Sequence, residues 1–559
     1  MLKTLTTPAW VARIVGLVGA LTLLSAVLPA VHDRARIIAG IVPPVFPAAA
    51  TTGAAAVGVI LVVLSRALRR GKFRAWLLAT VLSALATVLH VVKGLDIEEA
   101  VLSGALFVLL LTSRKGFTAK PDPRSVRRVV TVLTLGTALA TVLGWIWLSI
   151  DRDGQAPGTT WLDRLAQAFL GLLGIPGPVQ YVDQADATSS AVALVVLGAA
   201  VLLFAVLVAL QPTAGPHPMT DPERSRVDGL LDRWGAVDSL SYFALRDDRS
   251  AIFSPSGKAA ITYRVVGTVS LAAGDPLGDP EAWPGAISVW LQEAREYGWV
   301  PAVLGASERG AEAFHRAGLD ALELGDEAIL HTDEFSLEGR SMRVVRQAVS
   351  RCTRAGLTVT CHRVADLDEG TRAAVLAHAD AWRDGEVERG FSMALGRLAD
   401  PVDGRAVVVL STDDEGQLRG LLQLVPWGPD GLSLDVMRRD RAAENGIVEQ
   451  MVTGLMAQAP ALGVCRVSLN FAVFRSVFAR GERLGAGPVL RLWRSVLLAA
   501  SRFWQIESLY RANAKFQPVW TPRFICFRSS ADLPRVSVAA LRAEAFLVAP
   551  AWLKRLLPS

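Results

Sequence analysis

The chain has 559 residues, of which 52% are hydrophobic and only 20% charged, and its mean hydropathy is +0.37. These values exclude a purely soluble protein of ordinary composition, and the length predicts two or more domains. The formal net charge of +6 favours anionic partners such as nucleic acid, phosphorylated ligands or acidic lipid. Neither the four cysteines nor the seven histidines show the spacing of a zinc site, so no metal is expected.

The N-terminal part, residues 1–211, is predicted to be a membrane domain. A bilayer span needs about 20 apolar residues, and six runs reach or approach that length, the fourth being the shortest: 12–31, 49–68, 74–93, 98–113, 128–149 and 189–210. Lys and Arg concentrate between the second and third runs and between the fourth and fifth. Because basic loops stay on the cytoplasmic side, both termini and the whole C-terminal part are expected in the cytoplasm of a multi-pass cell-membrane protein.

Two loops of this domain are apolar but interrupted by proline and glycine, namely Ile41–Pro47 and Phe169–Val179. Irregular backbone is tolerated at membrane depth where it lines a cavity or is buried in protein. These loops are therefore either re-entrant segments or ordinary outer loops.

A proline-rich linker at 212–222 begins the second part of the chain. Beyond it, one order of elements occurs twice: strand, polar loop, helix, glycine, strand and helix. The predicted strands are 259–272 (interrupted at Gly267), 300–304, 405–410, 418–426, 432–437 and 465–470, and the helices are 286–297, 307–317 and 444–462. This pattern predicts an α/β domain of two tandem GCN5-related acyltransferase-like lobes, at 223–400 and 401–545, with an amphipathic tail at 546–559.

The stretch Leu432–Met451 combines the end of a strand, a basic loop and the start of a helix. Its polar residues are Asp435 at the strand end, Arg438 and Arg439 in the loop, and Asn445 with Gly446 at the helix start. Glu449 follows four residues after Asn445, on the same face of the helix. Free backbone N–H groups and the helix dipole make such a helix start a phosphate-binding site, and arginines add bidentate donors. The alternative is a solvated basic loop followed by an exposed helix.

The next strand ends at Asn470, and the segment from Arg475 to Arg528 is basic with interleaved aromatic residues. Such a segment suits a membrane surface or a nucleic-acid backbone. The alternative is a core helix with a solvated basic face.

Four motifs occur in order: Asp-x-Met-Arg-Arg, Asn-Gly-x-x-Glu, Ser-Leu-Asn-Phe-Ala, and Tyr-Arg-x-Asn-x-Lys-Phe-x-Pro-x-Trp-x-Pro-Arg at Tyr510–Arg523. Over about 220–545 the chain thereby resembles the phosphatidylglycerol lysyltransferase family, which includes the bacterial multiple peptide resistance factors. The resemblance implies transfer of lysine or alanine from aminoacyl-tRNA to phosphatidylglycerol at the cytoplasmic membrane face. It also implies a less anionic cell surface and resistance to cationic antimicrobial peptides.

Two departures from the family pattern are visible. Members often have more than a dozen spans, so flipping of the product lipid is in doubt here. Some relatives carry a fused lysyl-tRNA synthetase, which this sequence lacks, so the charged tRNA is expected from a separate aminoacyl-tRNA synthetase. A homo-oligomer is compatible with the sequence but not indicated by it.

Exchange of one ester for another needs a base, oxyanion donors and positive charge for phosphates, but no cofactor. Asp435 or Glu449 is the candidate base, although either could instead bind the α-ammonium of the amino acid. The candidate donors are Asn470 and Tyr510, and the candidate substrate-binding residues are Arg438, Arg439, Asn445, Gly446, Lys515, Arg523 and, with a structural role more common for a turn residue before proline, Asp275.

Two other functions stay open at this point. One is an acyltransferase of the same fold that uses acyl-CoA or forms peptide bonds. The other is a non-catalytic, membrane-anchored binding protein.

Overall fold

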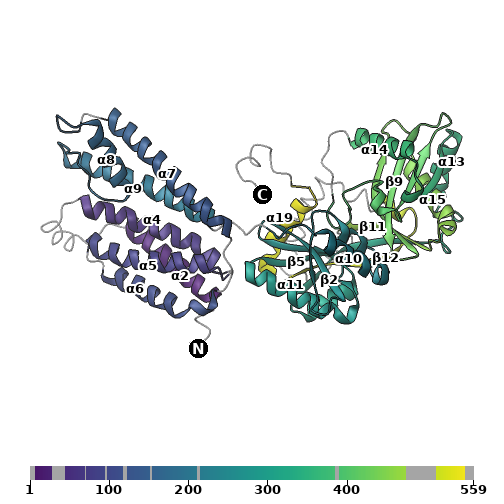
Figure 1. Cartoon of the computed structure of the whole chain (residues 1–559), viewed down its shortest axis with the longest axis horizontal. Coiled ribbons are helices and arrows are strands. Elements are labelled where there is room, and N and C mark those ends of the chain that lie inside the picture. Colours follow the sequence, from purple (N-terminus) through teal and green to yellow (C-terminus); the bar gives the residue numbers. More distant parts are fainter. Residues whose placement is uncertain are drawn as a thin grey trace. The chain divides into compact units, whose positions relative to one another are not determined.

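The computed structural model describes residues 7–27, 45–69, 71–94, 97–117, 123–151, 154–209, 215–383, 390–473 and 511–547. The chain forms two compact units, one reaching Thr213 and the other beginning at Ala214 (Figure 1). Several predicted features lie outside the described residues: part of the linker, most of the tail, Tyr510 and the basic segment that leads up to it.

The first unit is helical. Its helices are α2 (Pro8–Val27), α4 (Val45–Leu68), α5 (Phe73–Gly94), α6 (Ile97–Thr112), α7 (Pro123–Ile150), α8 (Trp161–Leu172) and α9 (Gln184–Ala209). Within the described ranges, five of them are long and apolar enough to cross a membrane: α2, α4, α5, α7 and α9. The predicted span at 98–113 corresponds to α6, which has 16 residues and is about 24 Å long. That length falls short of a hydrocarbon core of about 30 Å, so α6 is not among these five helices, and a sixth span stays a prediction.

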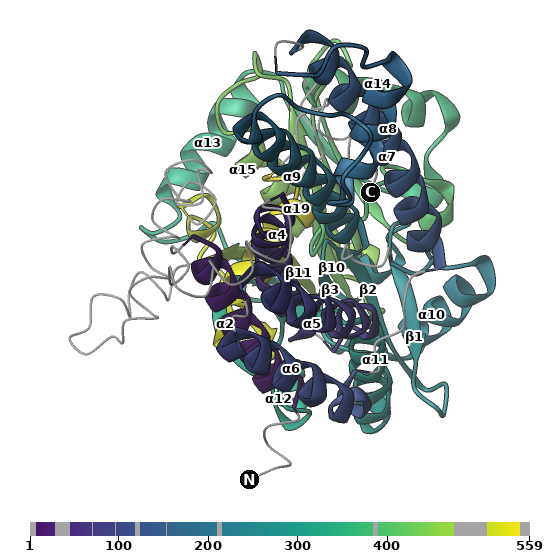
Figure 2. The same cartoon turned by 90° about the vertical axis from the view of Figure 1, so that its left-hand side faces the viewer.

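Glycines permit a close crossing of α2 and α4 in this unit. A Cβ atom on Gly19 of α2 would lie 2.9 Å from the carbonyl oxygen of Gly58 on α4, and the reverse distance is 2.8 Å. Small residues at such crossings are typical of helices that associate in lipid. Helices α2, α4, α5 and α6 accordingly lie together in Figure 2.

The apolar segment Phe169–Val179 is helical up to Leu172, as the end of α8. This helix has 12 residues, begins with a capping box between Thr160 and Asp163, and packs against α7 and α9. At about 18 Å it is too short to cross a bilayer. Phe169 and Leu172 line an apolar cavity of about 500 Å³ together with residues of α4, α5, α7 and α9.

The second unit is built on one mixed sheet. Its strands are β1 (Ser250–Phe253), β2 (Ala259–Val266), β3 (Val269–Ala273), β4 (Leu277–Gly278), β5 (Val300–Ala306), β6 (Asp320–His331), β7 (Thr358–Arg363), β8 (Val407–Thr412), β9 (Leu418–Trp427), β10 (Gly431–Arg439), β11 (Arg466–Val473) and β12 (Val519–Phe527). The helices are α10 (Asp221–Trp234), α11 (Trp283–Tyr297), α12 (Glu308–Arg316), α13 (Arg343–Arg354), α14 (Glu369–Arg383), α15 (Ile447–Gln458) and α19 (Leu533–Ala543). The predicted fold class, helical membrane part followed by an α/β domain, is confirmed.

The sheet order is β1-β2-β3-β5-β12-β6-β11-β10-β9-β8-β7, with β4 paired to β2. An antiparallel run followed by one parallel pair therefore occurs at both ends, with β3 parallel to β5 and β10 parallel to β11. In the middle the halves exchange strands, because β6 pairs with β11 and β12 pairs with β5. Since β7 pairs with β8 and α13 packs on α15, we propose that the second lobe begins before α13 and not at residue 401.

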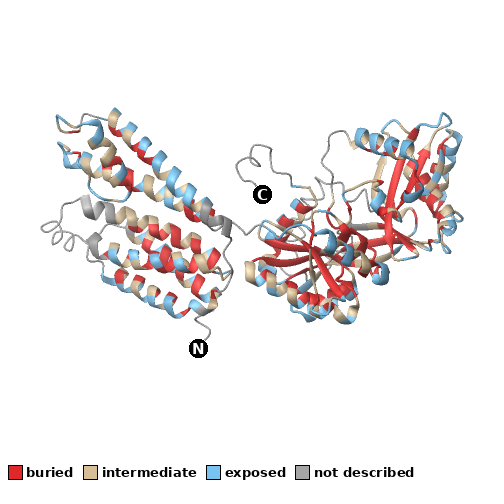
Figure 3. Ribbon diagram, in the orientation of Figure 1, coloured by how far each residue is buried: buried red, intermediate tan, exposed pale blue. Residues whose placement is uncertain are grey.

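Helices cover both faces of the second half of the sheet. Val407 and Val409 of β8 share a core cluster with α13 and α15, whereas Val408 and Leu410 share one with α14. This alternation follows from the two-residue period of a strand. Figure 3 shows the result, with buried residues along the strands and exposed residues on the outer helical surfaces.

Candidate functional site

The second half of the sheet contains a cavity where its two parallel strands separate. β10 and β11 pair in register only from Gly431 to Ser433, and β10 then has a bulge between Leu434 and Val436. Helix α15 begins beside the gap, and the space between these elements is a cavity of about 440 Å³. Diverging parallel strands next to a helix start leave room for a ligand in a fold whose strands are otherwise closely paired.

The cavity wall is largely apolar and carries more positive than negative charge. Its charged side chains are Arg351, Arg439, Glu449 and Lys515, and its apolar ones include Leu422, Leu434, Met437, Val452, Leu469 and Phe516. A wall of this kind fits a ligand that has both anionic and apolar parts.

The start of α15 depends on a glycine. Gly446 has φ +108°, and a Cβ atom there would lie 2.7 Å from Cβ of Ala348 on α13. No side chain caps this helix start, which leaves backbone N–H groups of its first turn without a side-chain acceptor. Asn445 and Gly446, both predicted as phosphate-binding residues, line the cavity at this point.

Glu449 and Lys515 form an ion pair in the cavity wall. Lys515 donates from Nζ to Oε1 of Glu449 at 2.7 Å, and the side chains are 16% exposed for Glu449 and 39% for Lys515. Arg439 is exposed and lines the same cavity. The structure thus brings together five predicted site residues: Arg439, Asn445, Gly446, Glu449 and Lys515.

Asp435 and Arg438 are not among the residues that line this cavity. The bulge in β10 turns Val436, the neighbour of Asp435, toward the α14 side of the sheet, whereas Leu434 and Met437 face the cavity. The two carboxylate oxygens of Asp435 accept hydrogen bonds from the backbone N–H of Leu395 (2.8 Å) and from Nε2 of Gln423 (2.7 Å). Asp435 therefore holds the segment around Leu395 against the sheet.

Asn470 lies at an irregularity in β11, where the pairing with β6 shifts between Ser468 and Phe471. It has φ +67°, and its Nδ2 donates to the carbonyl oxygen of Leu434 next to the β10 bulge. Its backbone N–H donates to Oγ of Ser468, which in turn donates to the buried Glu327 of β6. One chain of hydrogen bonds thus connects Glu327 with both strand irregularities.

Arg523, predicted as a phosphate ligand, is corrected to a structural residue. It is 4% exposed, and its nitrogens donate to Glu327, Asp238, the hydroxyl of Ser239 and the carbonyl oxygen of Gly305. Burial alone would lower its pKa, but the carboxylates of Asp238, Glu327 and Asp275 raise it above the usual range. With its donors used internally, Arg523 has none to offer to a phosphate.

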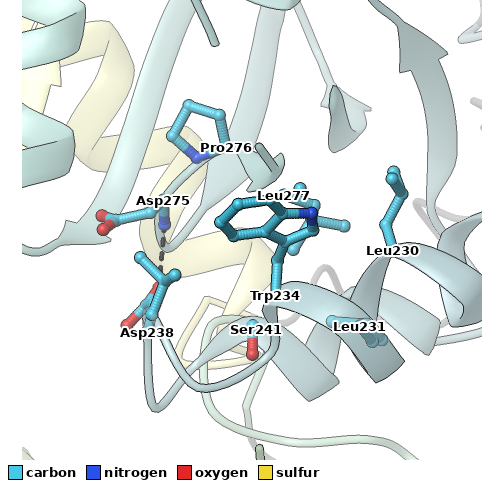
Figure 4. A pocket seen from close by; sticks show the side chains of 10 residues that line it. Leu230, Leu231, Trp234, Asp238, Ser241, Asp275, Pro276 and Leu277 are labelled. Atoms are coloured by element: carbon cyan, nitrogen blue, oxygen red, sulfur yellow. Dashed lines mark hydrogen bonds between the residues drawn. The ribbon is translucent and has the colours of Figure 1, made fainter. Parts of the chain in front are cut away.

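Asp275 is also buried, in the first half of the sheet. Its carboxylate accepts from the backbone N–H (2.8 Å) and the hydroxyl of Ser307 at the start of α12. Its own backbone N–H donates to Asp238 (Figure 4). Burial and the nearby charge of Asp238 raise the pKa of Asp275 to about 7, against the opposing effect of Arg523. Asp275 thus connects the end of β3 with the start of α12. Its substrate-binding role stays a prediction.

Several residues of this region are not predicted from the sequence: Arg351, Gln423, Glu327, Asp238 and Ser468. Gln423 could be found, because a lone amide inside the apolar strand LRGLLQLVPW requires buried partners. Tyr510 lies outside the described residues. Over the part of the chain that is described, no group of three or more His, Cys, Asp or Glu side chains could hold a metal ion.

Known proteins similar to this chain cover both of its units. Residues 228–527 match the family model of the phosphatidylglycerol lysyltransferase C-terminal region, and residues 3–210 match that of the transmembrane region of lysyl-tRNA synthetase. A protein from Mycolicibacterium gilvum, the lysylphosphatidylglycerol biosynthesis bifunctional protein LysX, is 43% identical over 97% of this chain and 50% of its own length. Its namesake from Rhodococcus jostii is 44% identical over 88% of this chain and 44% of its own.

The chain spans about half the length of these curated relatives. Among solved structures, L-PGS from Bacillus licheniformis is similar over 60% of this chain and 99% of its own, with 21% identity and a TM-score of 0.52. That likeness supports the fold of the second unit. The transmembrane match and the five apolar helices make the chain a membrane protein. Because the C-terminal match spans more than half of its residues, the chain belongs to the phosphatidylglycerol lysyltransferase family.

Proposed function

We propose that this chain transfers an aminoacyl group, lysine in the first place and alanine in the second, from aminoacyl-tRNA to phosphatidylglycerol. The observation that carries the proposal is the 440 Å³ cavity, in which the open start of α15, Arg439 and Lys515 offer phosphate-binding groups beside the carboxylate of Glu449. The names of the relatives, which refer to lysylphosphatidylglycerol biosynthesis, support lysine.

The reaction exchanges one ester for another. A glycerol hydroxyl of the lipid attacks the carbonyl carbon of the aminoacyl ester, and the ribose oxygen of the tRNA leaves. Glu449 accepts the hydroxyl proton and returns it to the leaving oxygen, because its carboxylate lies in the cavity wall. Asp435, the alternative base, has both oxygens engaged by Leu395 and Gln423. Lys515 and Arg439 hold phosphate. Asn470 and Tyr510 remain the proposed oxyanion donors.

The basic loops of the membrane domain support a site on the cytoplasmic face, where charged tRNA and the inner lipid leaflet are both available. An aminoacyl-tRNA synthetase supplies the donor. The product carries extra positive charge, which lowers the anionic charge of the membrane and weakens binding of cationic peptides.

The test uses the purified chain in phosphatidylglycerol vesicles with radiolabelled lysyl-tRNA or alanyl-tRNA. Ribonuclease-sensitive label in the lipid phase is the expected result. Loss of a charged hydrogen bond, worth about 1.5–3 kcal/mol, predicts that Lys515→Ala and Glu449→Gln slow transfer about 10- to 100-fold, while Asp435→Asn slows it less. Changes to the exposed Glu312–Arg316 pair of α12 serve as the matched control and leave the rate unchanged.

Absence of lipid label with every charged tRNA would overturn the proposal. Label that requires acyl-CoA and resists ribonuclease would assign the cavity to an acyl-CoA enzyme instead.

A further inference from the structure

Helix α13 carries an unusual density of exposed positive charge beside the cavity. Its sequence, RVVRQAVSRCTR, contains four arginines and no acidic residue. Val345, Ala348 and Cys352 are buried and face α15. At 100° per residue, Arg343 and Arg354 lie only about 20° apart on the opposite side of the helix and about 16 Å apart along it.

These arginines differ in how far they are engaged. Arg346 donates to the carbonyl oxygens of Leu337 and Gly339 and so fixes the preceding turn. Arg351 donates to the carbonyl oxygen of Asn445 (3.1 Å) and lies 3.5 Å from Glu444. Within the described residues, no carboxylate pairs with Arg340, Arg343 or Arg354, and all three are exposed. We define the α13 arginine face as Arg340, Arg343, Arg351 and Arg354.

The α13 arginine face is continuous with the cavity. Val344, Ala348 and Arg351 line the cavity wall, and Gly446 at the start of α15 packs on Ala348. Figure 1 shows α13 and α15 beside the same strands. A polyanion lying along α13 therefore ends next to Glu449 and Lys515.

The composition of this surface favours RNA over a membrane. A helix that lies on a bilayer inserts an apolar or aromatic face, but the apolar face of α13 is already buried against α15. The remaining exposed side chains are mostly polar, including Gln347 and Ser350, with Val344 as the exception. Among the described residues, the aligned Arg343 and Arg354 have no carboxylate partner, and their spacing suits the phosphates of a nucleic-acid backbone.

We propose that the α13 arginine face docks the acceptor end of the aminoacyl-tRNA, so that its ester enters the cavity beside Arg351. This inference rests on the proposed function, because it names the surface that binds the donor substrate.

The test measures binding of fluorescent, uncharged tRNA to the full chain in zwitterionic nanodiscs at several salt concentrations. We expect Arg343→Gln with Arg354→Gln to raise Kd at least about 10-fold and to reduce the slope of log K against log salt by about one per lost contact. The matched control, Arg316→Gln with Arg535→Gln, removes the same charge from arginines that are 78% and 41% exposed on α12 and α19, and leaves Kd within about twofold.

The inference is overturned if the α13 pair and the control pair weaken tRNA binding equally, or if neither pair weakens it. An unchanged tRNA Kd with a raised KM for phosphatidylglycerol also overturns it and assigns the surface to the membrane. Arg343→Lys with Arg354→Lys keeps the charge and should retain binding, which excludes misfolding as the cause of a loss. Because the tRNA-binding measurement does not depend on transfer, α13-dependent binding without lipid labelling would reject the proposed function alone, and labelling with α13-independent binding would reject this inference alone.

Discussion

The two ends of the sheet repeat one strand order but differ in the length of their parallel pairing. In the first half, β3 and β5 pair over five residues, Val269–Ala273 with Val300–Leu304, and Asp275 then fills the gap by binding Ser307. On the side of Asp275 that faces α10 and β4 lies a cavity of about 10 Å³, roughly one water molecule. In the second half, β10 and β11 pair over three residues and leave about 440 Å³. The larger cavity thus lies beside the shorter parallel pairing.

The two halves also use charge differently. In the first half, Arg523 is surrounded by the carboxylates of Asp238, Glu327 and Asp275, and this cluster is buried. In the second half, Arg439 and Lys515 line a cavity with one carboxylate between them. Charged side chains are therefore buried against one another in the first half, whereas those of the second half face a cavity.

The largest expected effect comes from breaking the hydrogen bonds between Asp275 and Ser307 in the first half of the sheet. A Cβ atom on Gly310 of α12 would lie 1.9 Å from Oδ1 of Asp275, so Gly310→Ala must displace the carboxylate from Ser307. We expect a loss of about 3 kcal/mol in the free energy of unfolding, measured by urea titration of the full chain in nanodiscs. Gly229→Ala on α10 meets no atom within 4 Å and should instead stabilise by up to about 1 kcal/mol. Equal changes in the free energy of unfolding for the two variants would contradict a stabilising role of the Asp275–Ser307 contact.

Filling the 440 Å³ cavity of the second half should abolish activity without unfolding the chain. Val448 of α15 lines the cavity and is only partly buried. Val448→Trp is expected to slow aminoacyl transfer about 100-fold because substrate no longer reaches Glu449, with the unfolding midpoint nearly unchanged. Val538→Trp, on the exposed surface of α19, is the control and should leave the rate unchanged. Full activity of the filled variant would place the reaction elsewhere.

A smaller effect tests how the two halves are coupled. Glu327 accepts hydrogen bonds from the hydroxyls of both Ser239 and Ser468, but only Ser468 continues to the backbone of Asn470. If Glu327 positions Asn470, Ser468→Ala lowers kcat about tenfold with KM for tRNA unchanged, and Ser468→Thr restores it. Ser239→Ala costs similar stability but changes kcat less than about twofold. Equal losses of kcat in the two alanine variants would mean a structural role only.

The smallest expected effect concerns pH. The pKa of Asp275 is about 7 in the folded chain against 3.8 for the free group, so the folded state binds more protons between these values. Stability from this group is fully present below about pH 4 and is lost as the pH rises through 7. Between pH 6 and 8 the loss is about 1 kcal/mol. Asp275→Asn should flatten the unfolding free energy over this range, and an unchanged pH profile would contradict the assignment.

Much of the fold follows from local patterns. The hairpin around Gly267, the strand β10 and the helix α15 all lie where hydrophobic periodicity and glycine predict them. No helix is predicted at 343–354, although Val345, Ala348, Val349 and Cys352 recur at the spacing of an amphipathic helix. The exchange of β6 and β12 is beyond such patterns, since pairing partners far apart in sequence leave no local signal.

The site could be predicted in part for the same reason. Arg439, Asn445, Gly446, Glu449 and Lys515 belong to contiguous motifs and meet at one helix start. Arg523 belongs to an equally dense motif, yet its strand runs into the centre of the sheet. A sequence shows that an arginine is present, but burial beside Asp238 and Glu327 decides whether its donors remain available.

The exchanged strands have a consequence for how this chain is made on the ribosome. The edge of β5 stays without its neighbour until β12 is synthesised, which begins about 210 residues after the end of β5. At 5–20 residues per second that delay is roughly 10–40 s. During this time the membrane helices are already available for insertion while the nascent first lobe exposes an open strand edge. Tethering that edge to one membrane early keeps it from the edges of other nascent chains, which is a hazard that a free soluble version would meet.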